Sequence, residues 1–359
     1  MSIIKITGGV EKLPRKEILS FKKFRSDFYR SDTLYVATEE FVTDMLLNKT
    51  SAFAKSLDVR TIYATEDGKR IAQCLYIVAP KTDFVQISHF DCPIERKDLA
   101  TAMIHTAMST AKEHGLKRIV AGLCGHLSYG VGILTETNLK NSFDTCYNKM
   151  HTAEFFKDFK ITNTLSAYRC QLEDAHHRLS ATTYDVGDLF VREADFSKFK
   201  DECETLRKLC DATIGNTYLY AKTSEGHFYE LLKELKLLLS GKNLLFLMHG
   251  NKEVGFVFWH PDFNCVVPAG RPLTKTAFAL ECIFNKRKID TVKLNAIGIL
   301  KDYKGKGTIA LLRALDERTK KHKFIETNFV WDNNIESTLI NRRLLGGKCR
   351  KFSVYEENL

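Results

Sequence analysis

The 359-residue sequence contains no long uninterrupted apolar segment. No stretch approaches about 20 consecutive apolar residues, the length that spans a bilayer as a helix. No apolar run follows the first Lys and Arg residues, as one would in a secretory signal peptide. We therefore expect a cytoplasmic protein without a membrane span. The ten cysteines form no Cys-x-x-Cys pair, and Cys74, Cys124 and Cys282 lie in apolar contexts, so we expect reduced, mostly buried thiols and no metal site.

Two phosphate-binding signatures and short repeats are also missing. The chain has neither the Walker spacing Gly-x-x-x-x-Gly-Lys-Ser/Thr nor the dinucleotide pattern Gly-x-Gly-x-x-Gly. It shows no close-period repeat. Its length is most naturally that of two domains, and 44% hydrophobic residues give each domain enough apolar material for a core.

The net charge of +10 raises the question of a nucleic-acid partner. The most basic segment covers residues 5–30. After Pro14, however, its Lys and Arg residues alternate with Ile18, Phe21 and Phe24 at a spacing typical of an amphipathic helix that packs on a domain. This spacing disfavours a solvated nucleic-acid-binding arm. It leaves tRNA open as a partner.

The two halves of the chain look like loose copies of one topology. The first predicts a hairpin of strands 59–65 and 71–78 about Asp67-Gly68, a strand at 84–90, a helix at 98–114 and a strand at 118–122. The second predicts a hairpin over 244–259 about Gly250-Asn251, a strand ending at 300, a helix after it, a strand at 324–331, a helix capped by Asp332-Asn333-Asn334 and a final strand at 352–355. Both halves therefore predict mixed α/β sheets.

Residues 296–312 form the most informative stretch, an apolar strand that runs into a basic, glycine-spaced loop and a helix. Gly305 and Gly307 allow the backbone to approach an anion closely, and the N–H groups of the first helical turn have no intrahelical acceptor. Lys301, Lys304 and Lys306 add positive charge. Such a junction can hold a pyrophosphate, although a solvated turn with surface lysines is the alternative.

This segment resembles the acyl-CoA loop of the GNAT acyltransferase superfamily, Arg/Gln-x-x-Gly-x-Gly/Ala. Lys304 stands at the Arg/Gln position, Gly307 matches, and Ile309 departs from the usual small residue. The resemblance implies acetyl-CoA or another acyl-CoA as co-substrate. The residues expected to bind it are Ile299, Leu300, Lys301, Lys304, Gly305, Lys306, Gly307, Thr308 and Asn334.

Further segments resemble a group of uncharacterised bacterial proteins with two GNAT folds in tandem. They are residues 122–134, 165–168, 255–264, 331–334, 345–347 and 351–356. The resemblance implies an α/β fold of tandem GNAT-like domains, each a mixed, mostly antiparallel sheet flanked by helices.

The first half lacks the glycine loop. At the corresponding place, residues 91–98 have an acid at each end, Pro93 without an N–H group, and no glycine. We therefore predict a degenerate GNAT-like domain at 1–175 and a GNAT domain with the acyl-CoA loop at 176–359. The polar stretch Glu173–Arg178 separates them.

GNAT chemistry requires a base that removes a proton from an amine. We predict that Glu326 is this base, because it lies in an otherwise apolar strand where burial would raise its pKa. Asp262 and Asn264 are the predicted acceptor-site residues, since they follow a strand at the rim of the sheet. The alternatives are a solvent-facing Glu326 and an ordinary Pro-Asp turn with Asn264 as its cap.

Many GNAT enzymes carry a tyrosine that protonates the departing thiolate. The corresponding window here holds Ile340, Asn341 and Arg342 and no tyrosine. Tyr303 or Tyr355 could substitute, or Arg342 could stabilise the thiolate by its charge, the alternative for Arg342 being a salt bridge on the helix surface. Three functions follow. The first is an acyl-CoA-dependent N-acyltransferase acting on a small-molecule or peptide amine. The second is a tRNA-dependent aminoacyl transferase of tandem-GNAT type. The third is a non-catalytic acyl-CoA-binding protein. The acceptor and the oligomeric state stay open.

Overall fold

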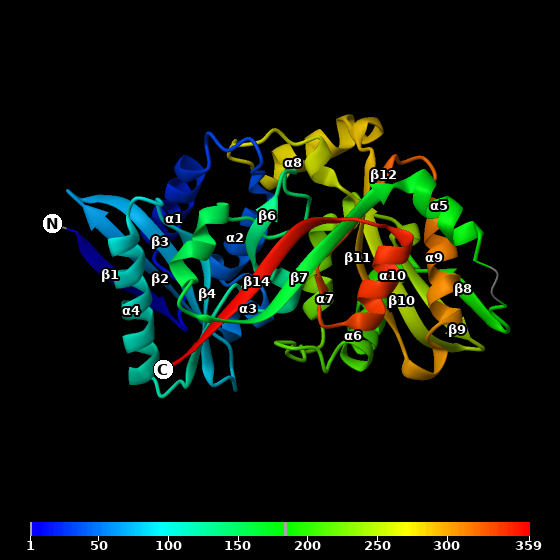
Figure 1. Ribbon diagram of the computed structural model, residues 1–359, viewed down its shortest axis with the longest axis horizontal. Helices are drawn as coiled ribbons and strands as arrows, with labels where there is room; N and C mark the ends of the chain where they lie inside the picture. The colour runs from blue at the N-terminus through cyan, green and yellow to red at the C-terminus, as the bar shows by residue number, and fades with distance from the viewer. Residues whose placement is uncertain (1, 183–184) are drawn as a thin grey trace.

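The computed structural model describes residues 2–182 and 185–359 as an elongated α/β molecule (Figure 1). The first half contains β1 (Ile3–Gly9), α1 (Arg15–Phe28), α2 (Glu40–Asn48), α3 (Ala52–Ser56), β2 (Asp58–Glu66), β3 (Lys69–Val78), β4 (Phe84–Asp91), α4 (Lys97–Glu113), β5 (Arg118–Ala121), β6 (Ile133–Thr137) and β7 (Lys160–Gln171). The second half contains α5 (Leu172–Ser180), β8 (Leu189–Glu193), α6 (Phe199–Thr213), α7 (His227–Leu232), β9 (Leu244–His249), β10 (Lys252–Pro261), α8 (Lys275–Phe284), β11 (Thr291–Ile299), α9 (Lys306–Thr319), β12 (Phe324–Thr327), β13 (Val330–Trp331), α10 (Ile335–Leu344) and β14 (Lys348–Asn358).

The strands form one sheet in which the two halves exchange their last strands. The order is β1-β2-β3-β4-β5-β14-β7-β12-β11-β10-β9-β8, with β6 paired to β14 and β13 paired to β7. The C-terminal strand β14 therefore lies next to β5 of the first half, and β7 lies next to β12 of the second. In Figure 1 the two long strands run side by side through the middle of the molecule, and the C-terminus lies in the first half.

The predicted fold class is confirmed, a mixed and mostly antiparallel sheet flanked by helices. Both predicted hairpins form, with Asp67-Gly68 between β2 and β3 and Gly250-Asn251 between β9 and β10. The predicted domain boundary between residues 175 and 176 falls within α5. No helix in the described parts of the chain has the length and apolar character to cross a membrane.

Two helix predictions are also confirmed. Helix α1 begins directly after Pro14 and buries Ile18 and Phe21 on one side, as an amphipathic helix does. Helix α10 begins after Asn334, whose side chain accepts a hydrogen bond from the Ser337 N–H group. Asn334 is thus the residue that starts this helix.

One strand prediction needs correction, because residues 324–331 do not form a single strand. Strand β12 pairs with both β11 and β7 and ends at Thr327, and the chain then leaves β11 while β13 continues the pairing with β7. The last link to β11 is the hydrogen bond that the Asn328 N–H group donates to the Leu294 carbonyl, at 2.8 Å. This departure opens the sheet at the place where the candidate site lies.

Candidate functional site

The parallel strands β11 and β12 pair over a short distance and then diverge. Their ladder joins Thr291–Leu294 to Phe324–Thr327, after which β11 continues to Ile299 along β10 alone. The register between β10 and β11 shifts here, since Phe258 faces Ala296 while Trp259 faces Leu294. Asn295 is the extra residue of this bulge, a feature that re-aims side chains next to functional sites. We call the opening between β11 and β12 the second-half wedge.

A cavity of about 380 Å³ begins in this wedge and extends to the first half. At the wedge it is lined by Leu294–Ile297, by Thr327–Trp331, and by Asn334, Ser337 and Asn341 of α10. At the other end it is lined by Phe41, Val42 and Met45 of α2, by His126–Gly130, and by Phe228 and Glu230–Leu232 of α7. The cavity therefore lies between the two halves of the molecule.

The glycine-spaced loop lies between β11 and α9, as predicted. Lys301, Lys304 and Lys306 are exposed, and Gly305, which precedes the helix, has a φ of +80° that favours glycine. Lys304 forms an ion pair of 2.7 Å with Glu336 on α10. Because Asn334 and Ser337 on either side of Glu336 line the cavity, the loop and α10 flank the same end of it. Exposed lysines, a permissive glycine and the N-terminus of a helix fit the pyrophosphate of an acyl-CoA, although the Lys306 N–H group donates to the Lys304 carbonyl at 3.1 Å.

Gly307 has a different reason for being glycine. It is buried, and a Cβ atom there would lie 2.5 Å from Cδ2 of Leu247 on β9. The residue permits close packing of α9 on the sheet and does not face an open cradle. Ile299 is likewise buried in the core, and the Leu300 N–H group donates to the Val254 carbonyl at 2.9 Å. Among the predicted cofactor residues, Asn334 lines the cavity itself, while Thr308 follows Gly307 in the first turn of α9.

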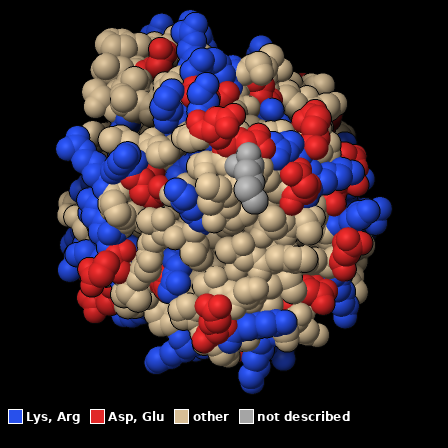
Figure 2. Space-filling model, turned by 90° about the vertical axis from the view of Figure 1, so that its left-hand side faces the viewer, with Lys and Arg blue, Asp and Glu red and all other residues tan. Residues whose placement is uncertain are grey.

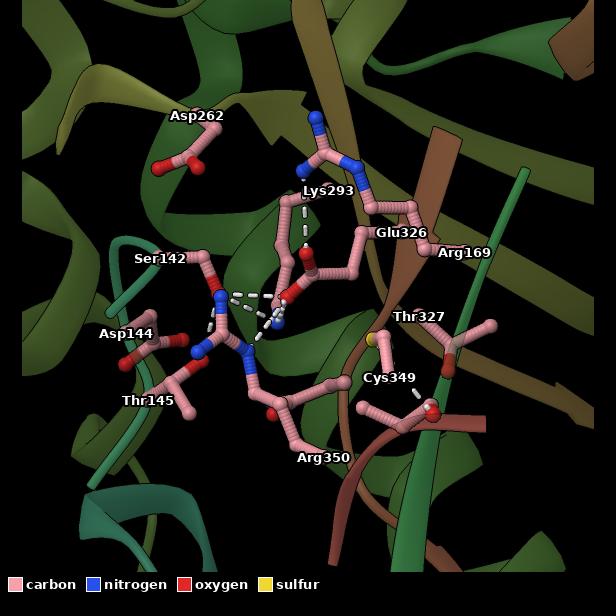
Figure 3. Close-up of polar contacts among 12 residues, drawn as sticks. Ser142, Asp144, Thr145, Arg169, Asp262, Lys293, Glu326, Thr327, Cys349 and Arg350 are labelled. Carbon is pink, nitrogen blue, oxygen red and sulfur yellow. Dashed lines mark hydrogen bonds and ion pairs between the residues drawn. The ribbon is translucent and has the colours of Figure 1, made fainter. Parts of the chain in front are cut away.

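Glu326 lies at the centre of a buried ion cluster (Figure 3). One carboxylate oxygen accepts hydrogen bonds from Ser142 Oγ (2.7 Å), Lys293 Nζ (3.1 Å) and Arg350 Nε (3.1 Å). The other accepts from Arg169 Nη1 at 3.2 Å. Burial alone would raise the pKa of Glu326. The positive charges of Lys293 and Arg350 lower it by more than burial raises it, so the pKa lies well below its usual value.

This environment does not supply the base role predicted for Glu326. The alternative that its side chain faces solvent is wrong, because it is fully buried. Its carboxylate points between three cations, and Glu326 is not among the described residues that line the cavity. A carboxylate with a lowered pKa and four donors keeps its charge and is a weak base.

Asp262 and Asn264 bind a segment of the first half. Asp262 Oδ1 accepts hydrogen bonds from the N–H groups of Phe143 (2.7 Å) and Asn264 (3.1 Å). Asn264 Nδ2 donates to the Asn141 carbonyl at 2.9 Å. Burial, together with the negative charge of Glu326, raises the pKa of Asp262 to about 6. The predicted Pro-Asp turn is therefore present, but its cap is Asp262, which accepts from the Asn264 N–H group, and not Asn264. The turn also holds residues that are distant in sequence.

We call residues 139–145 the crossing segment, because they belong to the first half and lie against the second. Arg350 donates hydrogen bonds to the Leu139 carbonyl (3.1 Å) and the Lys140 carbonyl (2.7 Å). Ser142 bonds to Glu326, and Asp262 binds Phe143 as described. The three predicted catalytic residues Glu326, Asp262 and Asn264 thus share one observed role, which is to fix this segment.

The crossing segment brings Asp144 to the cavity. Asp144 lines the cavity, and its carboxylate accepts a hydrogen bond from Nδ2 of the bulge residue Asn295. Asp144 is accessible to solvent through the cavity, but the protein atoms that surround its carboxylate raise its pKa to about 6, while the Asn295 hydrogen bond and the Lys293 charge oppose the increase. Sequence reasoning missed this residue. Asp144 and Asn295 are 151 residues apart, and no local spacing connects them.

A buried histidine also lines the cavity near the crossing segment. His260 packs its ring against Phe143 at 5.3 Å between centroids, and its Nδ1 lies 2.9 Å from the Pro261 carbonyl. Nδ1–H is therefore the donor, and Nε2 carries a lone pair. Burial lowers the pKa of His260 to about 4, so the ring is neutral. Within the described residues Nε2 has no hydrogen-bond partner.

The two predicted substitutes for the missing tyrosine lie elsewhere. The Tyr303 hydroxyl lies 3.2 Å from His249 Nδ1 at the surface, and Tyr355 is buried in the core of the first half. Neither is among the described residues that line the cavity. The described residues also contain no group of three or more His, Cys, Asp or Glu side chains arranged to hold a metal ion.

Comparison with known proteins identifies the fold. No protein-family model matches the sequence, and a search of curated proteins finds no match. Among solved structures, a tandem GNAT protein from the clavulanic acid biosynthesis pathway matches 99% of this chain over 98% of its own length, with a TM-score of 0.58 and 9% identity. A GCN5-related N-acetyltransferase from Sphaerobacter thermophilus matches 99% of the chain over 95% of its length, with a TM-score of 0.51 and 9% identity. A probable N-acyltransferase from Enterococcus faecalis V583 matches 100% of the chain over 73% of its length, with a TM-score of 0.57 and 8% identity. The chain has the tandem GNAT fold.

Proposed function

We propose that this chain, whose fold is that of the tandem GNAT proteins, transfers the acyl group of an acyl-CoA to an amine. The observation that carries the proposal is the cavity in the second-half wedge. It runs from the end flanked by the basic loop and α10 to a carboxylate, Asp144, and then on to the first half. A donor site and an acceptor site that meet at an ionisable group are what a direct transfer between two substrates requires.

Residues of the second half would hold the donor. Lys301, Lys304, Lys306 and the first N–H groups of α9 are suited to the pyrophosphate. The diverging strand residues Ala296 and Ile297 and the α10 residues Ser337 and Asn341 are suited to the chain that carries the thioester. The bound donor supplies an activated acyl carbon. The protein contributes orientation and exclusion of water.

The walls of the other end suggest the class of acceptor. Aliphatic and aromatic side chains of α2 and α7 predominate there, and burial keeps His126 and His260 neutral. The described lining includes two lysines, of which Lys275 pairs with Glu234 and Lys233 is exposed to solvent. Such a surface suits an amine carried on an apolar body better than a phosphorylated or sugar acceptor.

A pair of variants on α10 tests the donor site. Ser337 is half-buried against the cavity, whereas Leu339 on the same helix is 58% exposed and is not among the lining residues. Ser337→Trp should lower acetyl-CoA affinity by about 100-fold or more, because the indole occupies space needed by the ligand. Leu339→Trp should leave it within about twofold. Calorimetry with acetyl-CoA and longer acyl-CoAs measures both, and equal affinities for the two variants would contradict the donor site.

Turnover then distinguishes the remaining functions. Release of free CoA thiol is followed with a panel of amines of increasing apolar size, and tRNA is tested for binding in parallel. On the end of the molecule formed by β1 and α4, Lys and Arg side chains are interspersed with Asp and Glu around an uncharged centre (Figure 2). Tight tRNA binding without acyl-CoA binding would instead support a tRNA-dependent transferase. Acyl-CoA binding without turnover on any amine would support a binding protein.

A further inference from the structure

We propose that Asp144, a residue of the first half, is the general base for the transfer reaction of the second half. This inference rests on the proposed function, and it assigns the group that the reaction needs and that Glu326 does not supply. The first half would then be a working part of the active site.

The position of Asp144 is the first argument. It lines the cavity at the wedge, where its carboxylate accepts a hydrogen bond from Asn295, the bulge residue between Leu294 and Ala296. The same wedge residues are those suited to the thioester. A carboxylate at this point lies between the donor end and the acceptor end of the cavity, where an amine must lose a proton before it attacks.

The backbone at Asp144 is the second argument. Its φ of +62° lies in the left-handed region, which costs a non-glycine residue roughly 1 kcal/mol. Such a conformation persists only when surrounding contacts impose it. Here the contacts are those of the crossing segment with Arg350, Glu326 and Asp262. The ion cluster around Glu326 therefore fixes the crossing segment and positions the Asp144 carboxylate at the wedge.

The charged groups packed around Asp144 permit it to act as a base near neutral pH. Lys293 on β11 lowers its pKa, but the Lys293 ammonium lies 3.1 Å from Glu326, which neutralises much of this effect. Arg350 on β14 also pairs with Glu326, at 3.1 Å. Asp262, after β10, bonds to the backbone of the crossing segment. With the pKa near 6, a carboxylate is largely ionised at pH 7 and still a stronger base than a carboxylate of ordinary pKa.

The proposed step balances as follows. Asp144 takes a proton from the ammonium R–NH₃⁺, which leaves a neutral amine with a free electron pair. The nitrogen attacks the thioester carbonyl carbon, so that a C–N bond forms and the carbonyl π pair moves to oxygen. The oxygen electron pair then re-forms the C=O bond as the C–S bond breaks, and sulfur leaves with its electron pair and takes up a second proton from nitrogen. The products are an amide, CoA thiol and the proton that Asp144 returns to solvent.

The test compares Asp144→Asn with Asp67→Asn. Both positions carry an exposed Asp with positive φ, a conformation that Asn tolerates, but Asp67 lies in the β2–β3 turn and is not among the described residues that line the cavity. We expect Asp144→Asn to lower kcat by about 100-fold or more with acyl-CoA affinity unchanged, and Asp67→Asn to change neither. The rise of wild-type kcat/KM with pH near 6 should disappear in Asp144→Asn. Near-normal turnover in Asp144→Asn would overturn the proposal.

A second readout does not depend on turnover. In wild-type protein labelled with ¹³C-Asp and assigned through the backbone, the Asp144 carboxyl resonance should titrate near pH 6 without any ligand. A titration near the ordinary value of about 4 would contradict the proposal. If the wild type itself does not bind acyl-CoA, the proposed function fails instead, whereas normal wild-type turnover with an unaffected Asp144→Asn variant refutes only the assignment of the base.

Glu326→Gln tests the positioning role of Glu326 separately, because a residue that only positions Asp144 affects the reaction through Asp144. The variant should lower kcat at all pH values. The rise of kcat/KM with pH near 6 should remain, since Asp144 still titrates. If the rise of kcat/KM near pH 6 disappears in Glu326→Gln and persists in Asp144→Asn, Glu326 is the base and the inference is wrong.

Discussion

The two halves of this molecule build the same wedge and use it differently. In the first half, β4 and β5 pair in parallel over Phe84–Ile87 and Arg118–Ala121, as β11 and β12 do in the second. The Gly122 N–H group then donates to the Ile87 carbonyl at 2.9 Å, which corresponds to the bond between Asn328 and Leu294. The divergence of two parallel strands is therefore common to both halves, and by itself it does not create a site.

The contents of the two wedges differ. The first-half cavity measures about 50 Å³, compared with about 380 Å³ in the second half. Tyr147, Asn148 and Thr152 line it, and Asn148 hydrogen-bonds both the N–H (2.7 Å) and the carbonyl (3.1 Å) of Leu134. These residues directly follow the crossing segment. One stretch of chain thus fills the first wedge with Tyr147 and Asn148 and brings Asp144 to the second.

The junction between β4 and α4 in the first half also differs from the junction between β11 and α9 in the second, and again the second half is better suited to a ligand. Before α4, Arg96 is paired with Glu66 and Asp98, both at 3.0 Å, and Asp91 is buried against Arg25 at 2.5 Å. Before α9, the three lysines of the glycine-spaced loop are exposed, and of these Lys304 pairs with Glu336 at 2.7 Å. A single cation held by two carboxylates, next to a buried third, makes a poorer anion site than three exposed lysines of which one is paired. The absence of glycine between Asp91 and Asp98, read from the sequence, points to the same conclusion.

The largest effect we predict comes from giving the second half the residues of the first. The pair Lys293 and Glu326 corresponds in register to Gln86 and Val120. Glu326→Val alone should destabilise the protein by about 3–5 kcal/mol, because it leaves buried Lys293 and Arg350 without their counter-ion. The double variant Lys293→Gln, Glu326→Val should recover a large part of this loss. Urea unfolding measures both, and equal loss in single and double variants would show that the pair is not coupled.

The next effect concerns the two junctions. We expect one acyl-CoA per chain, and the triple variant Lys301→Ala, Lys304→Ala, Lys306→Ala should weaken its binding by roughly 10- to 50-fold, the sum of three exposed charge contacts. Arg96→Ala in the first half is the matched control and should leave affinity unchanged. Calorimetry gives the stoichiometry and both affinities. Two equivalent sites, or a weaker complex in Arg96→Ala, would remove the distinction between the halves.

Local patterns in the sequence predicted most of the fold. Hairpins about Asp67-Gly68 and Gly250-Asn251 and the cap at Asn334 follow from turn and cap chemistry within a few residues. The exchange of β7 and β14 could not be predicted in this way, because strand pairing between distant segments leaves no local signal. The early end of β12 at Thr327 was missed for the same reason, since β12 and β13 both pair with β7, a strand of the other half, and the change at Thr327 is the loss of pairing with β11.

The candidate site was only partly predictable. The basic loop and Asn334 could be read from glycine spacing and a capping residue. The environment of Glu326 depends on Ser142, Arg169 and Arg350, which three different segments bring together. Because Glu326 lies in an apolar strand, the sequence suggested a raised pKa for its carboxyl group. The cations that converge on it in the structure lower that pKa instead. Asp144 has no sequence signal, because its significance comes from the cavity that it faces.

The smallest predicted effect is on stability and depends on pH. The protein atoms around the solvent-accessible Asp144 carboxylate raise its pKa from 3.8 to about 6, so the folded state favours the protonated form. Stability associated with this group is therefore fully present below pH 3.8 and is lost as the pH rises through about 6. Asp144→Asn removes that loss. Because the side chain is partly open to the cavity, we expect its Tm to exceed that of the wild type by only about 1–2 °C at pH 7.5, with the difference shrinking towards pH 4. Asp67→Asn should show no such pH-dependent difference. Thermal unfolding across this range checks the sign, and a Tm of Asp144→Asn below the wild-type value at pH 7.5 would mean that the ionised carboxylate stabilises the crossing segment.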